Sequence, residues 1–217
     1  MSRSEHTGIA VIESRWWDDK NISVRGLFDL VSDISCGTPH GYHYEMVGSE
    51  YAVKEAIPRI AANRKCKVLC LATHANDDGL ELHNRDRLSR AELRNLLIKI
   101  EDQDGSVLNG LYLSSCMMGT EKLANFIFAK KVCLSWIAGY DKEVDFVDSA
   151  ALDLLFFREW SKTHRLDSPN KRIQQVAERL QQTVGGLMTE LGFGIYSRKQ
   201  GAERGAKNLV FGKLEIA

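Results

Sequence analysis

The sequence predicts a single α/β domain over residues 1–217, with a mainly parallel central sheet of about six strands and helices on both faces. Near-continuous apolar runs, typical of strands buried on both faces, alternate along the chain with segments of helical periodicity. Strands separated by helices require crossover connections, which favour parallel pairing. At 217 residues and 44% hydrophobic, the chain is long enough for one sizeable core.

The first half of the chain supplies three of the expected strands. Ile9–Glu13 predicts a first short strand, and residues 24–34 carry apolar side chains at helical spacing. His43–Val47 alternates like an edge strand, and the helix that follows runs from a cap at Ser49 through Ile60. Lys67–Thr73 is almost wholly apolar, which predicts a central strand.

The second half repeats this alternation. Ser89 and Glu92 have the spacing of a capping box and open a helix that extends to about residue 100. Gly110–Ser115 is the next apolar run and predicts a second central strand. The remaining expected elements are a helix at 120–129, a strand at 131–138, helices at 146–163 and 170–190, and a hairpin between 193–196 and 209–211 whose basic loop is 197–207.

Composition narrows the classes of partner and cofactor. The formal net charge is zero, so no overall field favours nucleic acid or a membrane surface. The first residues lack an apolar signal core and no run is long enough to span a bilayer, so we expect a cytoplasmic protein. The five cysteines are odd in number and are expected to be free thiols. No phosphate loop, HExxH or dinucleotide fingerprint is present, so we expect neither cofactor nor metal.

Two residues of catalytic type follow two of the predicted strands. His74 comes directly after the run that ends at Thr73, and Cys116 after the run that ends at Ser115. Ligands of parallel α/β sheets bind beyond the carboxyl ends of the strands. If the two strands are neighbours, a base and a thiol meet at one edge, as nucleophilic catalysis by cysteine requires.

Neighbouring residues supply the other parts of such a site. Cys116 precedes an expected helix start, whose dipole would favour the thiolate. The backbone N–H groups of Cys116 and Ala75 are candidate oxyanion donors. The turn Asn76–Gly79 opens to solvent, and its acids are expected to steer the imidazole of His74.

These windows resemble the caspase-like cysteine peptidases, within them the bacterial CHAT and short prokaryotic caspase-like branch. The family has a strand ending in His-Gly and a later strand followed by the catalytic Cys and a Gly. Here the windows are "VLCLATHANDDGLEL" and "GLYLSSCMMG", and the resemblance runs from about Ile9 to Trp160. Two departures stand out: Ala75 replaces the glycine, and Ser114 occupies the position where metacaspases tend to place an acid.

The resemblance implies an endopeptidase that cleaves protein or peptide substrates through an acyl-enzyme, with His74 and Cys116 as a catalytic dyad. Asp141 and Asp145 lie in the segment where the family builds part of its pocket for the residue before the cut. Their negative charges favour a basic residue at that position of the substrate. Trp17 and Asp18 are candidates for the wall of the substrate groove. The resemblance also suggests a bacterial defence or programmed-death setting and leaves room for a regulatory partner protein.

Several alternatives stay open from the sequence. A cysteine after a strand is often only a core residue, and His40-Gly41 is a competing His-Gly pair. Cys66, Cys70 and Cys133 are expected in the core, and Gly37 after Cys36 as a helix C-cap. At the level of function, the alternatives are a catalytically silent interaction module and a hydrolase of small amides or thioesters that uses the same dyad.

Overall fold

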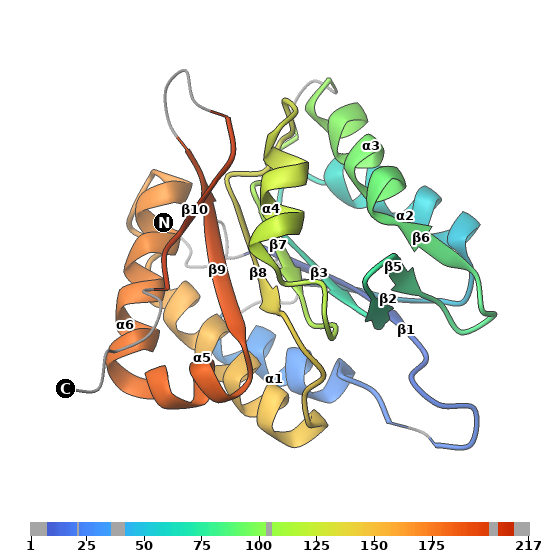
Figure 1. Ribbon diagram of the computed structural model, residues 1–217, viewed down its shortest axis with the longest axis horizontal. Coiled ribbons are helices and arrows are strands. Elements are labelled where there is room, and N and C mark those ends of the chain that lie inside the picture. The colour runs from blue at the N-terminus through green and yellow to red at the C-terminus, as the bar shows by residue number, and fades with distance from the viewer. Residues whose placement is uncertain (1–7, 21, 36–41, 103–105, 200–203, 211–217) are drawn as a thin grey trace.

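A seven-stranded sheet forms the centre of the computed structural model, which describes residues 8–20, 22–35, 42–102, 106–199 and 204–210 (Figure 1). In spatial order its strands are β10 (Ala206–Asn208), β9 (Phe193–Arg198), β8 (Trp136–Tyr140), β7 (Gly110–Leu113), β3 (Val68–Ala72), β1 (Ile9–Ser14) and β2 (Tyr42–Val47). All neighbouring pairs from β8 to β2 are parallel, whereas β9 runs antiparallel to β8 and β10 antiparallel to β9. The expected α/β class and mainly parallel sheet are therefore confirmed, with β2 as the predicted edge strand.

In the described part of the chain, six helices cover the two faces of this sheet (Figure 1). They are α1 (Arg25–Ser35), α2 (Glu50–Ala61), α3 (Arg90–Glu101), α4 (Glu121–Phe128), α5 (Phe146–Lys162) and α6 (Pro169–Glu190). The core accordingly divides into two clusters, one between the sheet and α2, α3 and α4, the other between the sheet and α1, α5 and α6. Every predicted helix is present, with bounds shifted by two residues at most.

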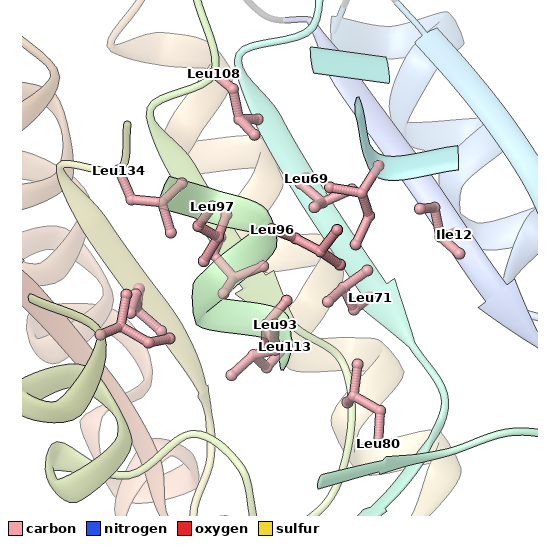
Figure 2. Packing of buried hydrophobic residues seen from close by; sticks show 14 of the residues in the cluster. Ile12, Leu69, Leu71, Leu80, Leu93, Leu96, Leu97, Leu108, Leu113 and Leu134 are labelled. Carbon is pink, nitrogen blue, oxygen red and sulfur yellow. The ribbon is translucent and has the colours of Figure 1, made fainter. Parts of the chain in front are cut away.

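Helix α3 shows how the sequence determines one of these layers. Leu93, Leu96 and Leu97 are spaced to share one face of the helix, and they pack in the cluster that contains Leu69 and Leu71 of β3 (Figure 2). The predicted capping box fixes the start of the helix: Ser89 Oγ accepts from Glu92 N at 3.2 Å, and Glu92 Oε2 accepts from Ser89 N at 3.0 Å.

A small antiparallel sheet after β3 was not anticipated. Its three strands are β4 (His74–Asn76), β5 (Gly79–Glu81) and β6 (Arg87–Ser89). Each strand has only three residues, too few to produce a visible alternation of polar and apolar side chains. Its first residue is His74, so the hairpin holds the candidate base directly beyond the end of β3.

Two other expectations need correction. The strand expected at 131–138 begins only at Trp136, because Val132 and Leu134 are buried in the core from an irregular segment. The loop expected at 197–207 is shorter, since β9 extends to Arg198 and β10 begins at Ala206. The candidates Cys36, Gly37, His40 and Gly41 lie outside the described residues. None of the described helices has the length and apolarity that a bilayer span requires.

Candidate active site

The two strands that precede the candidate dyad are neighbours in the sheet. β3 and β7 pair in parallel, with Leu71 opposite Leu113 at their carboxyl ends. The chain leaves both strands on the same side, and His74 and Cys116 line one cavity of about 330 Å³. The sequence expectation that these two side chains meet at one sheet edge agrees with this arrangement.

The ring of His74 has a defined orientation. Its Nε2 lies 2.7 Å from the main-chain carbonyl oxygen of Trp16. Because a carbonyl oxygen only accepts, Nε2 carries the hydrogen and the neutral ring keeps Nδ1 as its proton acceptor. The Trp16 indole packs edge-on to the imidazole, with ring centroids 5.1 Å apart.

The acids of the neighbouring turn do not orient this ring, contrary to the sequence expectation. Asp77 pairs with Arg90 at 3.1 Å, and Asp78 pairs with Arg87 at 2.9 Å. Both carboxylates therefore point into ion pairs on the hairpin surface. The group that orients His74 is a backbone carbonyl from the segment after β1.

Cys116 sits in a tight turn that is anchored to β8. Met117 adopts a left-handed conformation, with φ of 62°, and its N–H donates to Lys142 O at 3.3 Å. Gly119 N–H donates to Tyr140 O at 2.7 Å, and a Cβ on Gly119 would lie 2.0 Å from the Gly139 carbonyl carbon. The glycine after the candidate nucleophile is therefore required by close backbone packing.

The helix-dipole expectation for Cys116 is wrong. α4 begins at Glu121, and Thr120 caps it by accepting from Leu123 N at 3.1 Å. Met117–Thr120 separate Cys116 from the helix, and the dipole effect is confined to the first turn. The Cys116 N–H donates no hydrogen bond within the described ranges, so it is free to meet a ligand oxygen.

Ala75, the residue that replaces the family glycine, carries no backbone strain. It pairs with Leu80 across the β4–β5 ladder, and its φ lies outside the positive region. An alanine is therefore accommodated here without cost to the conformation of the hairpin.

The floor of the cavity contains a buried carboxylate that the sequence analysis missed. Asp153 of α5 is 2% exposed, and its Oδ1 accepts from the hydroxyls of Tyr112 and Tyr140, each at 2.5 Å. Its Oδ2 accepts from Ser114 Oγ at 2.7 Å. Burial raises the pKa of Asp153 above its usual value, although these hydrogen bonds lower it. No lysine, arginine or histidine pairs with this carboxylate among the residues that the structure describes.

Two features of the sequence are connected with this buried carboxylate. Asp153 interrupts the apolar stretch "ALDLLFF" on the face of α5 that packs on the sheet, and a charged residue at a core position is rare unless it has a role. Ser114, two residues before Cys116, stands where the resemblance to metacaspases leads one to expect an acid, and here it hydrogen-bonds to an acid supplied by a helix.

The expected substrate-binding residues take different positions. Trp17 lines the cavity, and its ring lies 6.0 Å from that of His74. Asp145 also lines it, but its carboxylate caps α5 by accepting from Val147 N at 2.7 Å. Asp141 is not among the lining residues, because it turns toward Gly192 and its N–H donates to Gly192 O at 2.9 Å.

A second, more polar cavity of about 610 Å³ lies on the other side of His74. It shares Trp16, Trp17 and His74 with the first cavity and does not include Cys116. Its charged lining residues are Arg15, Asp18, Asp19, Glu81, His83, Arg85 and Arg87. Asp18 belongs to this cavity and contacts His83 at 3.3 Å. No group of three potential metal-ligating side chains occurs in the described part of the chain.

Comparison with solved structures finds caspases. The initiator caspase Dronc of Drosophila has 9% sequence identity and a TM-score of 0.49, with 95% of this chain and 80% of that chain covered. Caspase-1 of Spodoptera frugiperda has 11% identity and a TM-score of 0.46, with coverages of 83% and 78%. No protein-family model and no curated protein sequence matches the chain. Both likenesses concern the fold alone.

Proposed function

We propose that this protein is a cysteine endopeptidase with Cys116 as nucleophile and His74 as base and acid. The observation that carries the proposal is that both side chains line one cavity beyond two neighbouring parallel strands. The Trp16 carbonyl adds support, because it occupies Nε2 of His74 and leaves Nδ1 to exchange protons. By the family resemblance, we place this activity on protein substrates in a defence or programmed-death setting, with a regulatory partner.

The proposed reaction forms and breaks one covalent bond to sulfur. Nδ1 of His74 takes the proton of the Cys116 thiol, and the sulfur attacks the scissile carbonyl carbon. The carbonyl electron pair moves to oxygen, which the N–H groups of Cys116 and Ala75 hold. When the C–N bond breaks, the leaving nitrogen takes the proton from Nδ1. Nδ1 then deprotonates a water molecule, which attacks the thioester carbonyl. The C–S bond breaks, the acid is released, and the thiolate takes back the proton from Nδ1.

The residue before the cut is proposed to be basic. Asp153 is a buried carboxylate without a cationic partner in the described residues, and it lines the cavity that contains Cys116. Burying an unpaired charge is costly, and a lysine or arginine side chain of the substrate would supply the missing positive charge. This assigns to Asp153 the role that the sequence analysis gave to Asp141 and Asp145.

The segment after the cut is proposed to leave through the second cavity. His74 has to protonate the leaving amine, so the released segment begins beside His74. The second cavity contacts His74 but not Cys116, which fits that path. Trp17 lines both cavities and would contact the substrate near the scissile bond.

The proposal is tested with Cys116→Ala and a library of internally quenched peptides. We expect the wild type to cleave after arginine or lysine, and Cys116→Ala to lose cleavage and labelling by a thiol-reactive peptide probe while melting at an unchanged temperature. Cys133→Ala, which removes another partly buried thiol outside the cavity, is the matched control and should cleave normally.

Other outcomes identify the alternatives. Cleavage by Cys116→Ala at the wild-type rate would exclude Cys116 as nucleophile. Probe labelling without peptide cleavage, together with turnover of small amides or thioesters, would favour a small-molecule hydrolase. Neither labelling nor turnover would favour a silent interaction module.

A further inference from the structure

A second buried carboxylate, Glu13 of β1, lies behind the wall of the cavity. Its side chain is 0% exposed and accepts four hydrogen bonds, all from uncharged groups. Oε1 accepts from Trp16 Nε1 at 2.9 Å and from Val24 N at 3.0 Å. Oε2 accepts from Ser23 Oγ at 2.7 Å and from the Tyr44 hydroxyl at 2.6 Å. Its acceptor capacity is therefore filled by the protein itself.

Three of these four donors come from the segment that connects β1 to α1. Trp16, Ser23 and Val24 all line the cavity that contains Cys116 and His74, whereas Glu13 does not reach it. The described residues of this segment, 15–20 and 22–24, have no regular secondary structure, so its shape depends on such side-chain contacts. Glu13 ties both ends of this segment to the sheet.

Trp16 connects this carboxylate to the candidate base. Its indole N–H donates to Glu13, and its own carbonyl oxygen accepts from Nε2 of His74 at 2.7 Å. The position of the carbonyl therefore depends on how the indole is held. No other described group accepts a hydrogen bond from the His74 ring.

We propose that Glu13 is a positioning residue for His74, which it orients through Trp16; as a role in catalysis this rests on the proposed peptidase function. No proton moves along the chain of contacts. The carboxylate fixes the indole, the indole fixes the backbone carbonyl, and the carbonyl keeps the hydrogen of the imidazole on Nε2. Nδ1 then stays unprotonated and available on the cavity side.

The first test compares two variants that each remove one hydrogen bond from Glu13. Trp16→Phe deletes the indole N–H and keeps an aromatic ring beside His74, whereas Tyr44→Phe deletes a donor on β2 that lies outside the cavity. We expect Trp16→Phe to lower kcat about 10-fold or more with a smaller change in KM, since misplacing a general base sacrifices much of its contribution. Tyr44→Phe should retain the wild-type kcat. Equal losses in both variants would overturn the proposal.

The second test asks whether a neutral acceptor rescues the function. In Glu13→Gln the amide oxygen can accept from Trp16 and Val24, while the NH₂ group donates to the Ser23 and Tyr44 hydroxyl oxygens, which can reverse their roles. We expect Glu13→Gln to keep kcat within about 3-fold of wild type and Glu13→Ala to lose about 10-fold or more. A loss in Glu13→Gln as large as in Glu13→Ala would contradict positioning by hydrogen bonding.

A spectroscopic measurement separates this inference from the peptidase activity. In a Cys116→Ala background, the ¹⁵N resonances of the His74 ring report which nitrogen carries the hydrogen. We expect the Nε2–H form in that background, its retention on adding Tyr44→Phe, and a mixture of both forms on adding Trp16→Phe. If no peptide is ever cleaved, the function fails but the ring spectra still test the positioning; an unchanged Nε2–H form with Trp16→Phe would overturn it.

Discussion

Glu13 and Asp153 are two buried carboxylates beside the same cavity, and they differ in how completely the protein satisfies them. Glu13 accepts two hydrogen bonds on each oxygen, one of them from a backbone N–H. Asp153 accepts from three hydroxyls and has only Ser114 on Oδ2. Asp153 lines the cavity and Glu13 does not. A carboxylate whose oxygens accept all their hydrogen bonds from the protein itself holds neighbouring segments in place. A carboxylate that faces a cavity and can accept further hydrogen bonds is able to bind a ligand.

The hydroxyl of Tyr140 makes Asp153 still less satisfied. It has one hydrogen and two acceptors in reach, Asp153 Oδ1 at 2.5 Å and Ser149 O at 3.0 Å. It can donate to only one of them at a time. The carboxylate thus competes with a backbone carbonyl for this hydrogen, whereas the two N–H donors to Glu13, from Trp16 and Val24, have no second acceptor among the described residues.

The largest expected effect is on stability, from Glu13→Ala. This change removes the acceptor of four donors, three of them in one connecting segment, and only the Ser23 and Tyr44 hydroxyls, 3.3 Å apart, can still pair with each other among the described residues. We expect a loss of about 4 kcal/mol in the free energy of unfolding, measured by urea denaturation, because each stranded buried group costs about 1 to 3 kcal/mol and water can satisfy some of them. Glu45→Ala, which removes an acid paired with exposed Arg59, is the control and should cost about 1 kcal/mol or less. A loss in Glu13→Ala no larger than in this control would remove the distinction between the two carboxylates.

A smaller effect is expected on specificity, from Asp153→Asn. The amide keeps an oxygen for the two tyrosine hydroxyls and removes the charge. We expect the preference of kcat/KM for arginine or lysine over leucine before the cut to fall about 10- to 100-fold, the equivalent of one charge-assisted hydrogen bond. Glu13→Gln, which neutralises the other carboxylate, should leave that preference unchanged. Peptide libraries measure both, and an undiminished preference in Asp153→Asn would exclude Asp153 as its source.

The smallest effect is a pH-dependent gain in stability in the same Asp153→Asn variant. Burial raises the pKa of Asp153 in the folded protein, so the proton-bound form favours folding. This stabilisation is complete below about pH 4, the usual pKa of an unfolded aspartate, and is lost as the pH rises through the raised folded pKa. Asparagine does not ionise, so the Asp153→Asn variant loses no stability as the pH rises. We expect the melting temperature of this variant to exceed that of the wild type by about 3 °C at pH 8, and by less at pH 4. If the melting temperature of Asp153→Asn exceeded that of the wild type by more at pH 4 than at pH 8, the prediction would be wrong.

The fold was predictable wherever local chemistry determined it. The apolar runs 67–73 and 110–115 predicted β3 and β7, and the Ser89–Glu92 capping box predicted the start of α3. The same runs predicted that His74 and Cys116 lie at one sheet edge, because parallel strands share the direction of their carboxyl ends. The hairpin β4–β6 was not predictable in this way, since its strands are too short for a pattern.

The partners of the candidate dyad depended on long-range contacts. No local pattern indicates that the carbonyl of Trp16, 58 residues before His74, accepts from its ring, because every residue has a carbonyl. Asp77 and Asp78 were the nearby candidates, and their arginine partners were visible only in three dimensions. Glu13 and Asp153 did leave a trace in the sequence, since Glu13 directly follows the apolar residues 9–12 and Asp153 interrupts the apolar stretch 151–157.

The close contact between Gly119 and Gly139 packs the turn that carries Cys116 against the end of β8. A Cβ on Gly119 would lie 2.0 Å from the Gly139 carbonyl carbon, and a Cβ on Gly139 would lie 3.2 Å from the Gly119 Cα, so the turn that carries Cys116 lies directly on the end of β8. Two further hydrogen bonds, from Met117 N and Gly119 N, tie that turn to the segment that enters the cavity wall. Because of these contacts, we expect a substrate or partner that displaces residues 140–145 to shift the turn that carries Cys116 as well.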